Sequence, residues 1–126
     1  MKFFWIISYI ISTFSPLIEM ARVKITVFKR VDPAVIFDGK VPNKPGTNDP
    51  YVTCEAFKEG QEFIVEDSLA KPEGFCNWAW RDIFKDVSVM RFGGNFWPGW
   101  VEEGKMYSCC TDGIRPVSFF MERLED

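Results

Sequence analysis

The sequence predicts a small α+β domain, built as an antiparallel sheet or open barrel of about five strands with one main helix. Two segments, residues 22–30 and 117–122, alternate apolar and polar side chains with the period of a half-buried strand. Between them, residues 77–92 carry apolar side chains at helical spacing. A chain of 126 residues with 47% hydrophobic residues has enough apolar surface for the core of one domain.

The first half of the domain is expected to contain three strands. In residues 22–30, Val and Ile side chains at every second position share one face. Residues 31–50 contain four prolines and several other turn formers, which predicts a long surface connection with a short apolar piece. Residues 51–57 and 61–67 flank a glycine-containing turn and are expected to form two further short strands.

The second half is expected to contain the helix and a hairpin. The helix covers residues 77–92, with Asn77 as its N-cap and Gly93 at the start of its stop signal. Two strands, within residues 106–110 and 114–124, lie on either side of an Asp-Gly dipeptide. That dipeptide is typical of a type I′ hairpin turn.

The stretch before the first strand differs from the rest of the chain. Residues 1–19 contain an apolar run of signal-peptide length that follows Lys2 and is too short to span a bilayer comfortably. The run lacks an Ala-x-Ala cleavage site, so a misassigned start or a dispensable extension is favoured over a signal or anchor. We therefore expect one domain over residues 20–126 in the cytoplasm, whereas export or membrane anchoring applies if residues 1–19 are genuine.

The absence of histidine excludes several classes of site. Ser-His-Asp and Cys-His catalysis, the His-Glu-x-x-His zinc motif and mixed Cys/His zinc fingers all need that side chain. The net charge of −3 and the lack of a basic run interleaved with aromatic residues argue against nucleic acid as a partner. A protein or a small molecule is the expected kind of partner.

The four cysteines, Cys54, Cys76, Cys109 and Cys110, lie in three predicted elements without a C-x-x-C pair. Cys76 precedes the helix directly, where unpaired N–H groups and the helix dipole favour a thiolate. Cys109 and Cys110 are adjacent, so in a strand they point to opposite faces and only one can join Cys76. Cys54, Cys76 and one of that pair, with Asp112 or solvent as a fourth ligand, would suit Zn²⁺, Cu(I) or an iron centre. Burial of the cysteines as small apolar side chains is the competing interpretation.

Three residues near these cysteines are supporting candidates. Trp78 has the size to wall a pocket beside Cys76, although packing in the core is the favoured interpretation. Asp112 belongs to the predicted turn. Arg115 follows that turn, where a guanidinium can stabilise a thiolate, hold an acidic ligand or lie in solvent.

The loop Phe92–Trp100 is rich in glycine and aromatic residues. Its largest side chains, Phe96, Trp97 and Trp100, form either a rim for a flat ligand or partner, or a lid folded over the core. The lid is favoured, because large aromatic side chains seldom stay exposed. A non-catalytic binding or interaction module that uses this loop is the rival to a thiolate site.

The segments "KPEGFCNWAW" and "CCTDGIRPVSF", together with "EAFKEGQEF" and "FGGNF", resemble a family of short, functionally uncharacterised, mostly prokaryotic proteins. The resemblance covers Arg22 to Leu124. Where the family commonly has proline after the first cysteine of these motifs, this chain has Asn77. The resemblance implies no established activity, but it places on family positions all four cysteines, Trp78, Asp112, Gly113, Arg115 and Pro116.

The sequence therefore predicts a domain with a thiolate site that binds a soft metal ion or cycles as a redox thiol. A third possibility is a thiol enzyme with Cys76 as its nucleophile. Because the chain has no histidine base, such an enzyme would depend on the helix dipole, on Arg115 or on a carboxylate.

Overall fold

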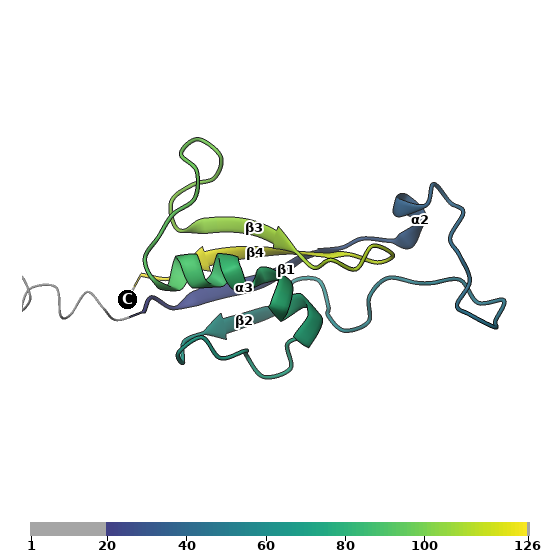
Figure 1. Ribbon diagram of the computed structural model, residues 1–126, viewed down its shortest axis with the longest axis horizontal. Helices are drawn as coiled ribbons and strands as arrows, with labels where there is room; N and C mark the ends of the chain where they lie inside the picture. Colours follow the sequence, from purple (N-terminus) through teal and green to yellow (C-terminus); the bar gives the residue numbers. More distant parts are fainter. Residues whose placement is uncertain (1–19, 126) are drawn as a thin grey trace, which may run out of the picture.

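The computed structural model describes residues 20–125 and contains one open, four-stranded antiparallel sheet with a long helix on one face (Figure 1). The strands follow the order β2-β1-β4-β3 across the sheet. Their bounds are β1 Val23–Arg30, β2 Glu62–Val65, β3 Lys105–Cys109 and β4 Val117–Arg123, and the helices are α2 Pro33–Ile36 and α3 Asn77–Arg91. The α+β class is thus confirmed, as an open sheet rather than a closed barrel. The predicted extension at residues 1–19 lies outside the described residues.

The core lies between one face of the sheet and α3. On β1, Val23, Ile25 and Val27 are fully buried, which confirms the alternation expected from the sequence. Ile83 and Val87 of α3 are equally buried and pack against that face. Removal of these apolar side chains from water, worth about 25 cal/mol per Å², is the main force that holds the helix to the sheet.

The prediction of a strand at residues 51–57 is wrong, and the sheet therefore has four strands. This segment runs as a loop because Phe57 turns into the core, where its ring contacts those of Phe63 and Phe75 edge-on. The loop is fixed from the side by Arg30 at the end of β1, whose Nη1 donates a hydrogen bond of 2.9 Å to the carbonyl of Cys54. A hydrogen bond from the side chain of Arg30 thus holds this segment, which is not part of the hydrogen-bonded ladder of the sheet.

The connection between β3 and β4 is longer than a type I′ turn, so the prediction of a type I′ hairpin turn at the Asp-Gly dipeptide is wrong. It spans residues 110–116, and Gly113 lacks the positive φ that a type I′ turn requires. The Oδ1 of Asp112 instead accepts hydrogen bonds from the backbone N–H groups of Ile114 and Arg115, at 2.9 and 3.2 Å. An Asx-type turn therefore shapes this loop.

The N-cap of helix α3 lies one residue earlier than predicted. Cys76, not Asn77, is the N-cap, with extended backbone angles of φ −62° and ψ 128°. The carbonyl of Cys76 accepts a hydrogen bond from the N–H of Trp80, while its sulfur makes no capping hydrogen bond. The helix ends at Arg91, and Gly93 follows with φ +82°, which confirms the predicted stop signal. Within residues 20–125, we find no helix with the length and apolar character needed to cross a membrane.

Arg91, the last residue of α3, joins three parts of the fold. Its side chain is only 1% exposed, and its Nη1 donates to the carbonyls of Ala21 and Val65, both at 2.9 Å. Its Nη2 donates to the carbonyls of Glu66 and Ser68. The guanidinium thus ties the helix end to the start of β1 and to the segment after β2. Figure 1 shows that α2 and its following loop extend away from this compact part, as the proline content predicted.

Candidate functional site

Three of the four cysteines line one pocket. Cys54, Cys76 and Cys110 surround a cavity of about 220 Å³ at the end of the sheet where α3 begins. They come from the loop before β2, from the N-cap of α3 and from the residue after β3. The other lining residues include all three of the supporting candidates and are Ala56, Phe57, Trp78, Ala79, Asp112, Arg115 and Val117.

The adjacent cysteines divide between the two faces of the sheet, as strand alternation predicts. Cys109 pairs with Ser118 in the ladder and is exposed, whereas Cys110 is 8% exposed and belongs to the core. Cys110 is therefore the member of the pair that meets Cys76, and Cys109 is not part of the pocket.

Cys110 is a protonated thiol at neutral pH. Burial raises the pKa of this thiol above its ordinary value of 9.0, and the nearby Asp112 carboxylate and Cys54 act in the same direction. Hydrogen bonds from backbone N–H groups oppose this effect, including one from Val117 to the sulfur at 3.3 Å. Burial outweighs these hydrogen bonds, so Cys110 stays a thiol unless the protein is perturbed or the pH is high. A thiol is less nucleophilic than a thiolate.

The raised pKa of Cys110 predicts how stability depends on pH. The unfolded chain loses this proton near its ordinary pKa of 9.0, while the folded protein keeps it to higher pH. We therefore expect the free energy of unfolding to include the full contribution of this thiol below that pKa and to lose it as pH rises through the folded value. Urea unfolding between about pH 7 and about pH 10 measures this slope. The Cys110→Ala variant should lose that part of the slope and Cys109→Ala should keep it; equal slopes in all three proteins would contradict the assignment.

Cys76 lies at the N-terminus of the 15-residue helix α3 and is partly exposed. Its sulfur makes no capping hydrogen bond. Backbone N–H groups in the first turn of a helix and the positive end of its dipole give this end of α3 a positive electrostatic potential. The pocket thus combines a partly exposed thiol at a helix terminus with a buried, protonated one.

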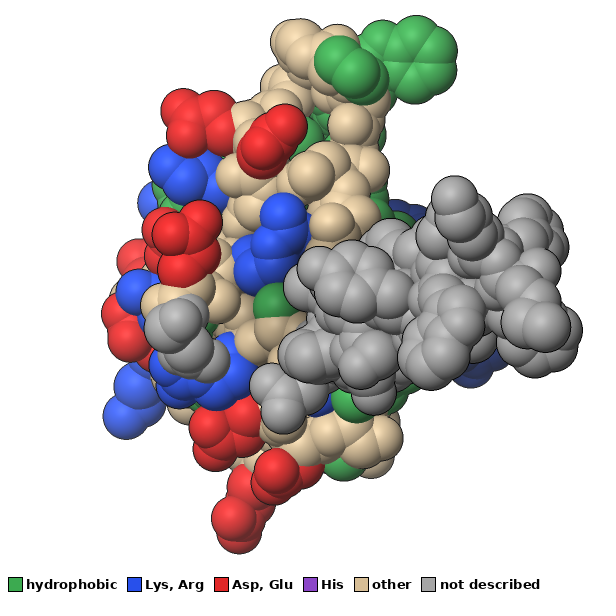
Figure 2. All heavy atoms as spheres, turned by 90° about the vertical axis from the view of Figure 1, so that its left-hand side faces the viewer, with side chains coloured by type: hydrophobic (Ala, Val, Ile, Leu, Met, Phe, Trp, Pro, Cys, Tyr) green, Lys and Arg blue, Asp and Glu red, His purple; other side chains and the backbone are tan. Residues whose placement is uncertain are grey.

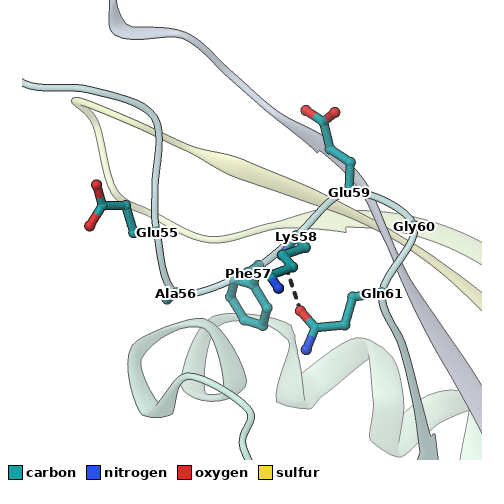
Figure 3. Close-up of a pocket in the computed structure, with 7 residues that line it drawn as sticks. All are labelled: Glu55, Ala56, Phe57, Lys58, Glu59, Gly60 and Gln61. Atoms are coloured by element: carbon teal, nitrogen blue, oxygen red, sulfur yellow. Dashed lines mark hydrogen bonds between the residues drawn. The ribbon is translucent and has the colours of Figure 1, made fainter.

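Figure 3 shows the loop that follows Cys54. Within that loop, Phe57 points toward α3, while Glu55 and Glu59 point away from it. The backbone N–H of Lys58 donates to Oε1 of Gln61 at 3.1 Å, which closes the turn before β2. The hollow of about 440 Å³ drawn in Figure 3 is lined by residues 55–61 alone and contains no sulfur.

A hydrogen-bonded chain fastens the loop after Cys110 to α3. The Nε1 of Trp78 donates to Oγ1 of Thr111 at 3.0 Å. Thr111 in turn donates from its backbone N–H and from Oγ1 to Oδ2 of Asp82, at 2.7 and 3.0 Å. Trp78 is 59% exposed, so the prediction that it packs in the core is wrong; it walls the pocket instead, while Trp80 packs partly buried against the core.

Asp82 and Thr111 were not identified from the sequence, although one signal pointed to them. Trp78 and Asp82 are four residues apart, which places them on one face of the helix. Thr111 directly follows the cysteine pair and carries a hydroxyl that can pair with that face.

Replacement of Asp82 by alanine is expected to lower the free energy of unfolding by about 1 to 2 kcal/mol, because two hydrogen bonds to a carboxylate are lost. The loop that carries Cys110 should also open more often, so this thiol should be alkylated faster in the folded protein. Urea unfolding and timed alkylation with peptide analysis measure both effects. The exposed Glu103→Ala serves as the control, and an Asp82→Ala variant that behaves like it would refute the fastening role.

Asp112 and Arg115 form the charged edge of the pocket. The Nε of Arg115 lies 3.4 Å from Oδ2 of Asp112. Burial acts to raise the pKa of Asp112, but the hydrogen bonds from the N–H groups of Ile114 and Arg115 and from the guanidinium outweigh it and hold that pKa below its ordinary value. Asp112 is therefore a carboxylate at neutral pH, and it lines the cavity together with Arg115.

The aromatic loop Phe92–Trp100 is not a closed lid, which corrects the favoured prediction. Trp97 is 77% exposed and Trp100 is 62% exposed, whereas Phe96 packs against the core. Figure 2 shows hydrophobic side chains projecting at its top, where the loop between α3 and β3 lies. Trp100 also borders a separate pocket of about 260 Å³, on the sheet face that carries Tyr107 and Phe120.

The three pocket cysteines are free thiols, as is Cys109. Within residues 20–125, no group of three or more Cys, Asp or Glu side chains has the arrangement needed to hold a metal ion. The pocket therefore gathers the predicted residues without forming a ready set of metal ligands.

Comparison of the chain with models of protein families, with curated proteins and with solved structures gives no match in any of the three. The resemblance in the cysteine motifs thus stays a prediction, and function is inferred from the pocket itself.

Proposed function

We propose that the protein is a thiol-redox protein in which Cys76 and one of its two pocket neighbours, Cys54 or Cys110, exchange electrons with small disulfides. The observation that supports this function is the convergence of three cysteines from three separate segments on one cavity. If the cysteines served only as small apolar side chains, we would expect them at separate positions in the core rather than around one cavity. A cytoplasmic location suits this function, since the cysteines are unpaired and cytosolic thiols are kept reduced.

The proposed reaction has two steps. The Cys76 thiolate first attacks one sulfur of the disulfide, which forms a mixed disulfide and releases the other sulfur as a thiolate. The thiol of Cys54 or Cys110 then gives its proton to solvent and attacks the sulfur of Cys76, which releases the second small thiol. Two protein thiols become one disulfide, and the two electrons reduce the small disulfide to two thiols.

The roles follow from the environments of the two kinds of thiol. Attack needs a sulfur that a ligand can reach, and Cys76 is partly exposed and lies at the N-terminus of α3. Cys110 is buried and protonated, so it suits the second step, after a mixed disulfide on Cys76 has brought a reactive sulfur next to it.

Thiol counting tests the proposal. The reduced protein contains four cysteines, and excess 2-hydroxyethyl disulfide is expected to consume two of them rapidly as an internal disulfide. Cys109 should then be labelled only slowly, as an isolated exposed thiol. Uniform, slow labelling of all cysteines without an internal disulfide would exclude this function.

Soft-metal binding by the same cysteines is the second candidate. It is favoured by the sulfur of Cys110, which accepts backbone N–H hydrogen bonds, an environment that stabilises thiolate ligands. Zn²⁺, Cu(I) or iron would be held by Cys54, Cys76 and Cys110, with Asp112 or solvent as the fourth ligand. Metal analysis, with thiol titration before and after a chelator, tests it: one bound ion that shields three thiols supports it, and four accessible thiols with no ion exclude it.

A binding module is the third candidate, and it is favoured by the exposure of Trp97 and Trp100. Its ligand or partner would lie on the aromatic loop Phe92–Trp100 and leave the thiols unchanged. Labelled protein used to isolate partners, with Trp97→Ala and Trp100→Ala as the loss-of-binding variants, separates this function from thiol chemistry.

A further inference from the structure

Arg115 has unused binding capacity at the edge of the thiol pocket. Its side chain lines the cavity, and its one contact with Asp112 joins Nε to Oδ2 at 3.4 Å, long for a hydrogen bond. Among residues 20–125, the two terminal nitrogens of Arg115 have no hydrogen-bond partner. The planar end of the guanidinium is thus free to bind a ligand, and this end is the part that pairs with carboxylates in a bidentate manner.

Asp112 does not compete for that end of Arg115. Its Oδ1 is occupied by the N–H groups of Ile114 and Arg115 itself, and its Oδ2 faces Nε. The carboxylate therefore holds the loop in shape and orients the arginine. No other charged side chain lines the cavity, whose remaining walls are the three cysteines, Trp78 and small or apolar residues.

The size of the cavity limits what can enter. About 220 Å³ is the space of roughly seven water molecules, which admits one half of a small disulfide but no folded segment of another protein. A ligand that reaches Cys76 from this cavity meets mostly apolar walls, with the guanidinium of Arg115 and the carboxylate of Asp112 at the edge.

We infer that the disulfides reduced in this pocket are low-molecular-weight disulfides that carry a carboxylate, which Arg115 binds while Cys76 attacks the sulfur. This inference rests on the proposed thiol-redox function and specifies its substrate class. The bonds that form and break are those of the two exchange steps above. Arg115 neither gains nor loses a proton or an electron; it binds the carboxylate and fixes the distance between the disulfide and Cys76.

Two disulfides of similar size separate binding from chemistry. Dithiodipropionate carries a carboxylate on each half, whereas 2-hydroxyethyl disulfide is neutral. The rate of small-thiol release from each is measured with the reduced wild-type protein and with Arg115→Gln, Arg115→Lys and Arg81→Gln. Arg81 is an exposed arginine of α3 and serves as the matched control. Thermal unfolding of each variant verifies that it is folded.

The wild-type protein is expected to react about tenfold faster with dithiodipropionate than with the neutral disulfide, because a charge-assisted hydrogen bond forms only with the former. Arg115→Gln should remove this preference, so that the two disulfides react at similar rates. Arg115→Lys should keep part of it, since the charge remains but the planar end is lost. The preference should also shrink as salt is added, and Arg81→Gln should behave like the wild type.

Two results would overturn the inference while the redox function stands: equal rates with both disulfides in the wild type, or an Arg115→Gln variant that keeps the preference. If Arg115→Gln keeps the preference and slows both disulfides equally, Arg115 acts on Cys76 rather than on the ligand. Failure of both disulfides to oxidise Cys76 would instead remove the redox function, and the inference with it.

Discussion

Cys76→Ser is expected to slow the release of small thiols from a disulfide by at least about a hundredfold, because the variant lacks the atom that attacks. The effect is large since no other thiol combines exposure with a helix N-terminus within the described part of the chain. Serine is close to cysteine in size and is a favoured N-cap residue, so helix α3 should form normally. The rate of thiol release by the reduced protein measures the effect.

Three further serine variants make this prediction specific. Cys109→Ser should keep the wild-type rate, because Cys109 lies outside the pocket. Cys54→Ser and Cys110→Ser should keep the first step, and the variant that lacks the resolving thiol should stop at the mixed disulfide, which intact-mass measurement detects. A Cys76→Ser variant with unchanged kinetics, or a Cys109→Ser variant that is inactive, would show that the pocket does not carry the reaction.

Arg91→Met is expected to lower the free energy of unfolding by about 3 to 5 kcal/mol. Methionine fills a similar length, but it leaves the carbonyls of Ala21, Val65, Glu66 and Ser68 without their buried donor. It also removes a positive charge from the last turn of α3, where that charge is favourable. Urea unfolding followed by circular dichroism measures the loss.

Arg91→Lys and Arg81→Met are the matched controls. Lysine keeps the charge but has one nitrogen in place of the planar group, so it should recover only part of the loss. Arg81 is exposed on α3, and its replacement should change stability by less than about 0.5 kcal/mol. A loss of under about 1 kcal/mol in Arg91→Met would mean that water satisfies the four carbonyls equally well.

Local patterns in the sequence were sufficient for the parts of the fold that depend on local periodicity. The alternation of residues 22–30 predicted β1 and its buried face, and the spacing in residues 77–92 predicted α3. The same period-two rule separated Cys109 from Cys110 before the structure assigned the inner position to Cys110. These properties follow from the backbone geometry of single elements.

The errors arose where distant parts of the chain compete for one residue. Phe57 does not lie in the expected strand, because its side chain packs into a buried aromatic cluster with Phe63 and Phe75. Trp78 does not pack in the core as expected. Its indole instead donates a hydrogen bond to Thr111, which follows β3. Such contacts depend on how the helix sits on the sheet, and a single sequence does not encode that placement in any short pattern.

The exposed indoles of Trp97 and Trp100 are a different case. Burial statistics favoured a lid, but the loop that carries them projects from the sheet, and Phe96 alone reaches the core. Large aromatic side chains are usually buried, but this loop projects from the sheet and leaves the two indoles in solvent. Exposed indoles of this kind are typical of contact surfaces.

The most direct test of the thiol pocket is to identify which cysteines become linked when the reduced wild-type protein reacts with a small disulfide. Peptide mapping by mass spectrometry after acid quenching gives that answer. The geometry predicts a disulfide between Cys76 and either Cys54 or Cys110, with Cys109 remaining a free thiol or a slowly formed adduct. A product in which Cys76 stays a free thiol, while Cys109 alone is oxidised, would contradict the account.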